Sequence, residues 1–252
     1  MLRKKPGLPE VRQMRNENII ISCNGLAVGY GEEAVLSDIN LQIKAGTFLP
    51  FVGPNGVGKT TLLRTILGFL PPLAGELLHP FAQQPPGYVP QVSTLDRLYP
   101  VTAREVVCMG LYPRLGLWKR PDKHMQQEVD DYIERFNLTH HAHRPLEELS
   151  GGMRQKIMIA RALVSGADVL IMDEPAAGLD EQSEFDLVRL LHQLSKHDGK
   201  TVLFAQHSIE PVIGLAEEVC HFSPGRIHIT PLLEFLEKRN LFLKQEAQNV
   251  CH

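Results

Sequence analysis

The sequence has no long apolar run. None of its uncharged apolar stretches approaches the roughly 18 to 20 residues that a transmembrane helix needs. The N-terminus also lacks the apolar core of a secretory signal. We therefore expect a chain that works in the cytoplasm or lies peripherally on a membrane.

Cysteine is scarce, and positive charge is not in excess. The four cysteines, Cys23, Cys108, Cys220 and Cys251, lie far apart without a C-x-x-C pair, which argues against a disulfide framework or a zinc ribbon and predicts reduced thiols. A net charge of -3 at pH 7 argues against a nucleic-acid binder that relies on overall basicity, so we expect no nucleic-acid partner. The 252 residues, 43% of them hydrophobic, suffice to bury a substantial core.

Residues 53 to 61 carry the most informative motif. They read Gly53-Pro54-Asn55-Gly56-Val57-Gly58-Lys59-Thr60-Thr61 and satisfy G-x-x-x-x-G-K-[ST]. In such a loop the backbone N–H groups face phosphates, the lysine contacts the β and γ oxygens, and the hydroxyl binds Mg²⁺. An apolar run at 48–52 precedes the loop. Apolar residues at helical spacing follow it over 62–70, until Gly68 and Pro71-Pro72 stop the helix. This order of strand, loop and helix predicts a nucleotide site at a helix N-terminus.

Tyr30 and Pro50 raise separate questions. Tyr30 lies between two glycines, in a predicted turn that separates strands at 19–21 and 41–43. One possibility is that its ring stacks on adenine, a contact worth about 1 to 3 kcal/mol. The alternative is a surface side chain in a turn, and the sequence leaves both interpretations open. Pro50 removes a ladder hydrogen bond, so we expect a local break in strand pairing there.

The middle of the chain predicts two capped helices. Residues 71–90 are rich in proline and glycine, with a short strand at 88–89 that leaves Gln91 at the start of a loop. Thr102 begins a helix of capping-box form, and Asp122 caps the next one. The second helix has one apolar stripe that we assign to the core, formed by Met125, Val129, Tyr132, Ile133 and Phe136.

Three histidines, His140, His141 and His143, crowd the loop after these helices and raise a metal hypothesis. No nearby Cys, Asp or Glu completes a ligand set at familiar spacing, so a solvated loop is favoured.

Ser150, Gly151 and Gly152 begin a further predicted helix. Ser150 is suited to the N-cap, and the two glycines expose the N–H groups of the first turn to an approaching anion. A glycine costs roughly 1 kcal/mol in a helix interior, so the pair hints at a second phosphate contact. The apolar residues of this helix run from Met153 to Val164.

Two adjacent carboxylates, Asp173 and Glu174, end a continuous apolar run that begins after Asp168. Such a run is typical of a central parallel strand, whose carboxyl end is where ligands of open α/β sheets bind. Neighbouring strand residues point to opposite faces, so one carboxylate is free to hold Mg²⁺ while the other polarises a water. Two exposed acids at a strand end are the alternative.

The last third of the chain alternates again between helix and strand. Gly178-Leu179-Asp180 turns into a helix with Phe185, Val188, Leu191 and Leu194 facing inward, and Gly199 ends it. A buried strand at 201–205 leads to His207, a position that by itself is more often structural than catalytic. A short strand at 227–229 and an amphipathic helix at 232–245 follow.

Taken together, seven ordered motifs resemble those of the ATP-binding-cassette (ABC) ATPases. They are Tyr30, Gly53 to Thr61, Gln91, Leu149 to Gly152, Asp173-Glu174, Gly178 to Asp180 and His207. The resemblance covers about residues 19 to 230. The resemblance implies an α/β fold: a P-loop NTPase core with a mixed sheet and flanking helices, an N-terminal antiparallel β-subdomain and an inserted helical signature subdomain. It implies a polar leader at 1–18, an ATPase domain at 19–230 and a C-terminal helix and tail at 231–252. Within that domain, 19–90 and 166–230 form the nucleotide-binding core and 91–165 the helical subdomain.

The resemblance also implies a role for each motif in binding and hydrolysing ATP with Mg²⁺. Tyr30 resembles the adenine-stacking residue, and Thr60, Gln91 and Asp173 the Mg²⁺ ligands. Glu174 resembles the general base and His207 the γ-phosphate contact, with Gln91 also reporting to a membrane partner. In a homodimer of cassettes, Ser150, Gly151 and Gly152 cover the ATP on the other subunit. The remaining nucleotide-binding positions implied are Gly53, Pro54, Asn55, Gly56, Gly58, Lys59, Thr61 and Asp180.

One position departs from the family. The signature is usually L-S-G-G-Q, but Met153 stands where the glutamine would complete a capping box with Ser150. One lost cap contact is worth about 1 kcal/mol, too little to abolish ATP binding between subunits. We expect an active ATPase with a changed rate.

Several segments are similar to the ATPases of zinc, manganese and iron importers, among them Val89 to Gln91, Tyr99 to Thr102 and Glu174 to Asp180. The segment 111–118 is also similar to the siderophore and cobalamin group. The first similarity is longer and implies a metal-cation transporter, with integral membrane permease subunits and an extracytoplasmic solute-binding protein as partners. The ATPase would lie peripherally on the cytoplasmic face of the inner membrane. A soluble cassette ATPase of repair, translation or cofactor assembly and a non-catalytic regulatory cassette are the alternatives.

Overall fold

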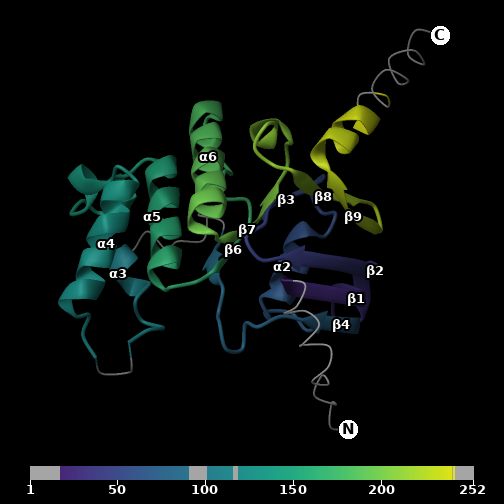
Figure 1. Ribbon diagram of the computed structural model, residues 1–252, viewed down its shortest axis with the longest axis horizontal. Helices are drawn as coiled ribbons and strands as arrows, with labels where there is room; N and C mark the ends of the chain where they lie inside the picture. The colour runs from purple at the N-terminus through teal and green to yellow at the C-terminus, as the bar shows by residue number, and fades with distance from the viewer. Residues whose placement is uncertain (1–17, 91–100, 116–118, 240, 242–252) are drawn as a thin grey trace. The chain divides into compact units, whose positions relative to one another are not determined.

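The computed structural model describes residues 18–90, 101–115, 119–239 and 241 (Figure 1). Gln91, the polar leader up to residue 17 and the tail beyond residue 241 lie outside the described residues. The chain divides into two compact units, one of residues up to 78 together with those from 206 onward, and one of residues 79–205.

A three-stranded antiparallel sheet begins the first unit. Its strands are β1 (Ile19–Tyr30), β2 (Glu33–Lys44) and β4 (Ala74–Leu78), in the order β2-β1-β4. The antiparallel subdomain is therefore confirmed, but the predicted turn at 29–31 is misplaced, because β1 continues until Tyr30 pairs with Glu33. We missed β4, which lies in the segment read as rich in proline and glycine.

The strand before the phosphate motif belongs to a second group of strands in the first unit, which combines parallel and antiparallel pairing. β3 (Phe48–Val52) is buried throughout and runs parallel to β8 (Glu218–Ser223), which pairs antiparallel with β9 (Arg226–Pro231). Pro50 does not end β3, and the pairing with β8 involves the two residues that follow it, Phe51 and Val52. β8 was not predicted, because His221 interrupts its apolar run.

Helices complete the first unit. α2 (Lys59–Ile66) starts directly at the lysine of the phosphate motif and ends before Gly68, whose φ of 79° is left-handed. The predicted stop at Gly68 is therefore confirmed, whereas the helix begins at Lys59, three residues before the apolar spacing that indicated it. A one-turn 3-10 helix, η4 (Glu210–Val212), follows His207, and residues 232–239 form the predicted C-terminal helix.

Three parallel strands form the sheet of the second unit: β5 (Gly87–Val89), β6 (Val169–Met172) and β7 (Thr201–Gln206), which ends at the unit boundary. β6 and β7 are buried along their whole length, as their continuous hydrophobicity predicts. α6 (Glu181–Asp198) joins them and ends at Gly199 with a left-handed φ of 66°. The three predicted strands are confirmed. Of the residues assigned to the inner face of α6, Phe185 is only half-buried.

The helices α3 (Ala103–Met109), α4 (Lys123–Arg135) and α5 (Gly151–Val164) pack on one another in the second unit (Figure 1). Two 3-10 turns, η2 (Thr139–His141) and η3 (Leu146–Glu148), connect α4 to α5. The predicted capping box of Thr102 with Glu105 is present, and Asp122 accepts a 2.8 Å hydrogen bond from the backbone N–H of Met125. Local capping chemistry therefore defines these helix starts as expected.

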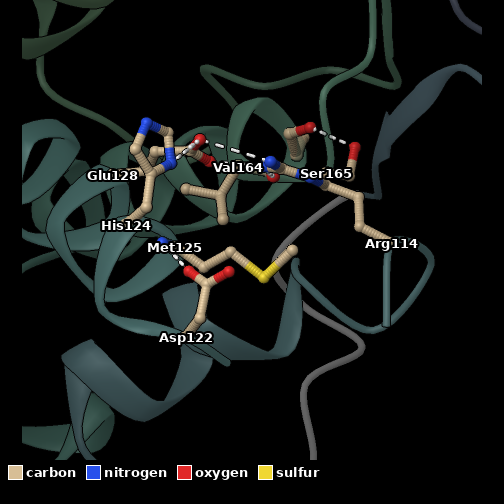
Figure 2. A network of polar contacts seen from close by, with 8 residues as sticks. Arg114, Asp122, His124, Met125, Glu128, Val164 and Ser165 are labelled. Atoms are coloured by element: carbon tan, nitrogen blue, oxygen red, sulfur yellow. Dashed lines mark hydrogen bonds and ion pairs between the residues drawn. The ribbon is translucent and has the colours of Figure 1, made fainter. Parts of the chain in front are cut away.

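Arg114 ties the far end of α5 to α4, as Figure 2 shows. Its guanidinium binds the Glu128 carboxylate and donates a 3.0 Å hydrogen bond to the carbonyl oxygen of Val164. The hydrogen bonding of the Arg114 guanidinium to the Glu128 carboxylate holds the pKa of Glu128 below its usual value. A cation suits the negative end of the helix dipole, so Arg114 anchors the C-terminus of α5.

Among the described residues, no helix is both long and apolar enough to cross a membrane.

Candidate active site

The phosphate loop has the backbone that its glycines require. Gly58 is the N-cap of α2 with a φ of 106°, and no side chain caps this helix. A methyl group on Gly58 would lie 2.6 Å from Leu36 Cδ1 and 3.1 Å from Val35 Cγ1. The loop therefore packs tightly on β2, and no side chain occupies the N-terminal end of α2, where anions are favoured.

Lys59 places a positive charge on this loop. The side chain is only 4% exposed, and its Nζ donates hydrogen bonds to the carbonyl oxygens of Gly53 at 2.7 Å and Pro54 at 2.9 Å. The ammonium is thus held across the loop by backbone oxygens. A buried ammonium at a helix N-terminus is suited to phosphate oxygens, and the binding of phosphate by this loop stays a prediction.

Gly53 is needed because another chain segment approaches it. A Cβ at this position would lie 2.6 Å from the carbonyl oxygen of Phe222 in β8. Gly53 and Pro54 line a cavity of about 1270 Å³ in the first unit, and the exposed His207 lines the same cavity. The structure thus brings His207 to the beginning of the phosphate loop.

Tyr30 lies in the same unit as the loop. Its side chain is 49% exposed at the end of β1, and the hairpin that it begins leads into Val35 and Leu36, which contact the position of Gly58. The sequence alone did not indicate these two contacts with the loop, because residues 33–40 were not predicted to form a strand. The exposed ring is available for stacking, and its role with adenine stays a prediction.

Asp173 and Glu174 follow β6 in the second unit. Asp173 is 7% exposed, and its N–H donates a 3.2 Å hydrogen bond to the carbonyl oxygen of Val89. Glu174 has a φ of 49°, a left-handed conformation that costs a non-glycine residue about 1 to 3 kcal/mol. Such strain is typical of functional turns, and it places the two carboxylates immediately beyond the strand.

Ser150 caps α5 as predicted. Its Oγ accepts a 3.3 Å hydrogen bond from the backbone N–H of Met153. Gly151 and Gly152 form the first turn, and a methyl group on Gly151 would lie 3.0 Å from Leu179 Cδ2. The first turn of α5 therefore lies next to the turn that leads into α6.

Asp180 caps α6. Its carboxylate accepts hydrogen bonds from the N–H of Ser183 at 2.9 Å and the hydroxyl of Ser183 at 2.7 Å. The Ser183 hydroxyl and then the Ser183 N–H hold the pKa of Asp180 below its ordinary value. The residue thus has a clear structural task, and its part in nucleotide binding stays a prediction.

The predicted site residues fall into two groups. Tyr30, the phosphate loop and His207 lie in the first unit, and Ser150 to Gly152, Asp173, Glu174 and Asp180 in the second. Gln91 lies outside the described residues. Among the described residues, no group of three His, Cys, Asp or Glu side chains is arranged to hold a metal, and His140, His141 and His143 form none.

Comparisons with known proteins agree with these motifs. Residues 36–177 match the family described as ABC transporter. The chain is 36% identical over 204 residues to the manganese transport system ATP-binding protein MntB of Listeria innocua, covering 79% of this chain and 85% of that protein. It is 39% identical over 197 residues to the zinc transport system ATP-binding protein TroB of Treponema pallidum, covering 76% and 74%.

The fold agrees as well. The dimeric structure of MJ0796, a bacterial ABC transporter cassette, is similar with a TM-score of 0.71 at 27% identity, covering 84% of this chain and 99% of that one. The predicted fold class is thus confirmed. The chain belongs to the ABC transporter family, as one of its ATP-binding and ATP-hydrolysing cassettes.

Proposed function

We propose that the chain is the ATPase subunit of a membrane importer for manganese or zinc cations. The observation that carries this proposal is the identity of 36–39% to manganese and zinc transport ATP-binding proteins over about three quarters of the chain. An ATPase subunit does not contact the cargo, so the proposal concerns the system that the chain drives.

In this proposal, ATP binds on the phosphate loop. Lys59 and the N–H groups of Gly56 to Thr61 hold the phosphate oxygens, and Tyr30 stacks on the adenine. The remaining loop positions, Gly53, Pro54 and Asn55, shape the turn. The buried Lys59 ammonium and the uncapped start of α2 fit a polyphosphate, since both offer donors to anionic oxygen.

Thr60, Asp173 and Gln91 would hold Mg²⁺. A hydroxyl, a carboxylate and an amide are the hard oxygen donors that this ion prefers, so the donor set fits. Bound Mg²⁺ would neutralise charge on the phosphate oxygens. Gln91 would in addition sense the membrane partner.

Glu174 is the proposed general base. Its carboxylate accepts a proton from the attacking water, and His207 donates a hydrogen bond to the γ-phosphate. The left-handed φ of 49° at Glu174 supports the assignment, because strained residues cluster at active sites. The shared cavity wall of His207 and Gly53 supports the role of His207.

Two copies of the chain would form the working ATPase. The exposed Ser150 hydroxyl and the first turn of α5 at Gly151 and Gly152 would cover the nucleotide on the other copy, and Asp180 would also contact nucleotide. The dimeric state of MJ0796 supports this arrangement. Residues 91–165 would act as the helical subdomain beside a nucleotide-binding core of 19–90 and 166–230.

The partners proposed are integral permease subunits and an extracytoplasmic solute-binding protein. The chain would sit on the cytoplasmic face of the membrane as a peripheral subunit. The import names of its relatives support these partners, for example the zinc import ATP-binding protein ZnuC of Yersinia pestis, at 35% identity.

ATP turnover is tested with Glu174→Gln in the purified full chain. Loss of the base should lower the hydrolysis rate by about 10²-fold or more while ATP binding persists. Glu147→Gln, an exposed acid in η3, is the matched control and should keep the wild-type rate. An unchanged rate in Glu174→Gln would favour a non-catalytic regulatory cassette.

The transport role is tested in the native host. Deleting the gene should reduce uptake of labelled manganese or zinc, and the wild-type chain but not Glu174→Gln should restore it. Affinity purification should recover a multispan permease. Normal metal uptake with loss of siderophore or cobalamin uptake would instead indicate a siderophore or cobalamin transporter. Copurification with soluble assembly factors alone would contradict a transporter role.

A further inference from the structure

Gln155 is the one side chain of the described residues whose amide nitrogen and amide oxygen are both buried without a hydrogen-bond partner. It lies on α5 and is only 1% exposed. Buried polar atoms are almost always paired, because an unpaired one keeps the full cost of leaving water. A side chain that bears this cost twice calls for a physical reason.

The position of Gln155 on α5 shows which segment it faces. It follows Gly151 by four residues and Gly152 by three, so it shares their side of the helix. A methyl group on Gly151 would contact Leu179, and one on Gly152 would lie 3.8 Å from Ser183. Helical side chains lean toward the N-terminus, which directs the Gln155 amide toward the chain leading from Glu174 into α6.

That chain forms a strained turn. It begins with Glu174 at a φ of 49° and contains Gly178 at 78°, and two turn hydrogen bonds hold it, from Ala177 N–H to the Glu174 carbonyl and from Leu179 N–H to the Ala176 carbonyl. α5, by contrast, is anchored at both ends, by Ser150 at its start and by Arg114 at its end (Figure 2). α5 is thus held at both ends, with its first turn next to Leu179 of the strained segment.

We propose that Gln155 is a positioning residue for ATP hydrolysis, whose amide bonds backbone groups of the turn 174–180 when that turn adopts its hydrolytic conformation. The two unpaired atoms then disfavour the resting arrangement and stabilise the active one. This inference rests on the role proposed above for Glu174. It assigns Gln155 no contact with nucleotide.

The test replaces Gln155 by Met, which has similar volume but no amide, in the purified full chain. Removing two unpaired atoms should raise the melting temperature by about 2 to 8 °C. Losing the hydrogen bonds of the active conformation should lower kcat by about five- to tenfold, with KM for ATP within about twofold. Met158→Leu, a fully buried position on the same helix, is the control and should keep the wild-type kcat.

The combination of higher stability and lower kcat separates this role from ordinary packing, which would lower both. A Gln155→Met chain with wild-type kcat overturns the inference, as does a lower melting temperature, which would mean that the amide is already bonded at rest. If Gln155→Met does not fold, Gln155→Leu is examined in the same way, and failure of both also overturns it. Glu174→Gln measured alongside distinguishes the two proposals: an unchanged rate there refutes the role of Glu174 itself.

Discussion

Alanine at Gly58 should destabilise the chain more than alanine at any glycine whose surroundings are open. Gly58 has a φ of 106°, and a Cβ there would lie 2.6 Å from Leu36 Cδ1 and 2.8 Å from its Cγ. The matched comparison is Gly68, beyond the end of α2, which has a φ of 79° and no atom within 4 Å of a built Cβ. The two positions share the backbone strain and differ in the steric overlap.

The magnitudes follow from these two terms. Left-handed backbone costs an alanine about 1 to 2 kcal/mol, which is the whole loss expected for Gly68→Ala. Overpacking against Leu36 adds about 1 to 3 kcal/mol, so Gly58→Ala should lose about 2 to 5 kcal/mol. At about 2 to 4 °C per kcal/mol for a chain of this size, the melting temperature should fall by about 2 to 8 °C for Gly68→Ala and by about 4 to 20 °C for Gly58→Ala.

Thermal unfolding and binding of a fluorescent ATP analogue measure both effects. Because Gly58 begins the helix that presents N–H groups to phosphate, Gly58→Ala should also weaken nucleotide binding by about tenfold or more, a change of about 1.4 kcal/mol, whereas Gly68→Ala should leave the affinity unchanged. Equal losses of stability in the two variants would refute the steric reasoning. Equal affinities would refute the assignment of the loop as the phosphate site.

Three further predictions concern residues outside the loop. Met153→Gln should restore the capping box with Ser150 and raise the melting temperature by about 2 to 4 °C, whereas Met153→Ala should not. Burial, and then the charge of His228, lowers the pKa of His221 from its ordinary value, so the unfolded chain binds more protons than the folded chain below about pH 6.5. The melting temperature should therefore fall as the pH drops below about 6.5. This fall should be less steep in His221→Phe. Burial raises the pKa of Cys23 to about 12, so a thiol reagent at pH 8 should modify Cys23 slowly in the folded chain and rapidly in denaturant, as peptide mass mapping would show.

Much of the local structure was predictable because its causes lie within a few residues. Thr102 and Glu105 form their capping box, Asp122 and Ser150 cap their helices, and Gly199 ends α6 in the left-handed conformation. Each of these needs only a side chain and a backbone group of the same turn. The continuous apolar runs of β6 and β7 likewise identified buried strands.

The missed strands β4 and β8 depend on partners far away in the sequence. β4 and β8 have weak strand patterns of their own. β4 gains its hydrogen-bonding partners by pairing with β1, and β8 gains its partners by pairing with β3 and β9. The predicted turn at 29–31 failed for a local reason, because pairing with Glu33 across the β1–β2 hairpin keeps Tyr30 in the strand. Strand propensity depends on such context more than helix propensity does.

The sequence alone determined the proposed chemistry of the candidate site, since the loop 53–61 and the carboxylates Asp173 and Glu174 are recognisable from residue type and spacing. Only the tertiary structure decided the constraints on that chemistry. Phe222 requires glycine at position 53, and burial leaves the Gln155 amide without a partner. Packing between distant segments creates both constraints, and residue spacing along the chain does not encode the distance between such segments.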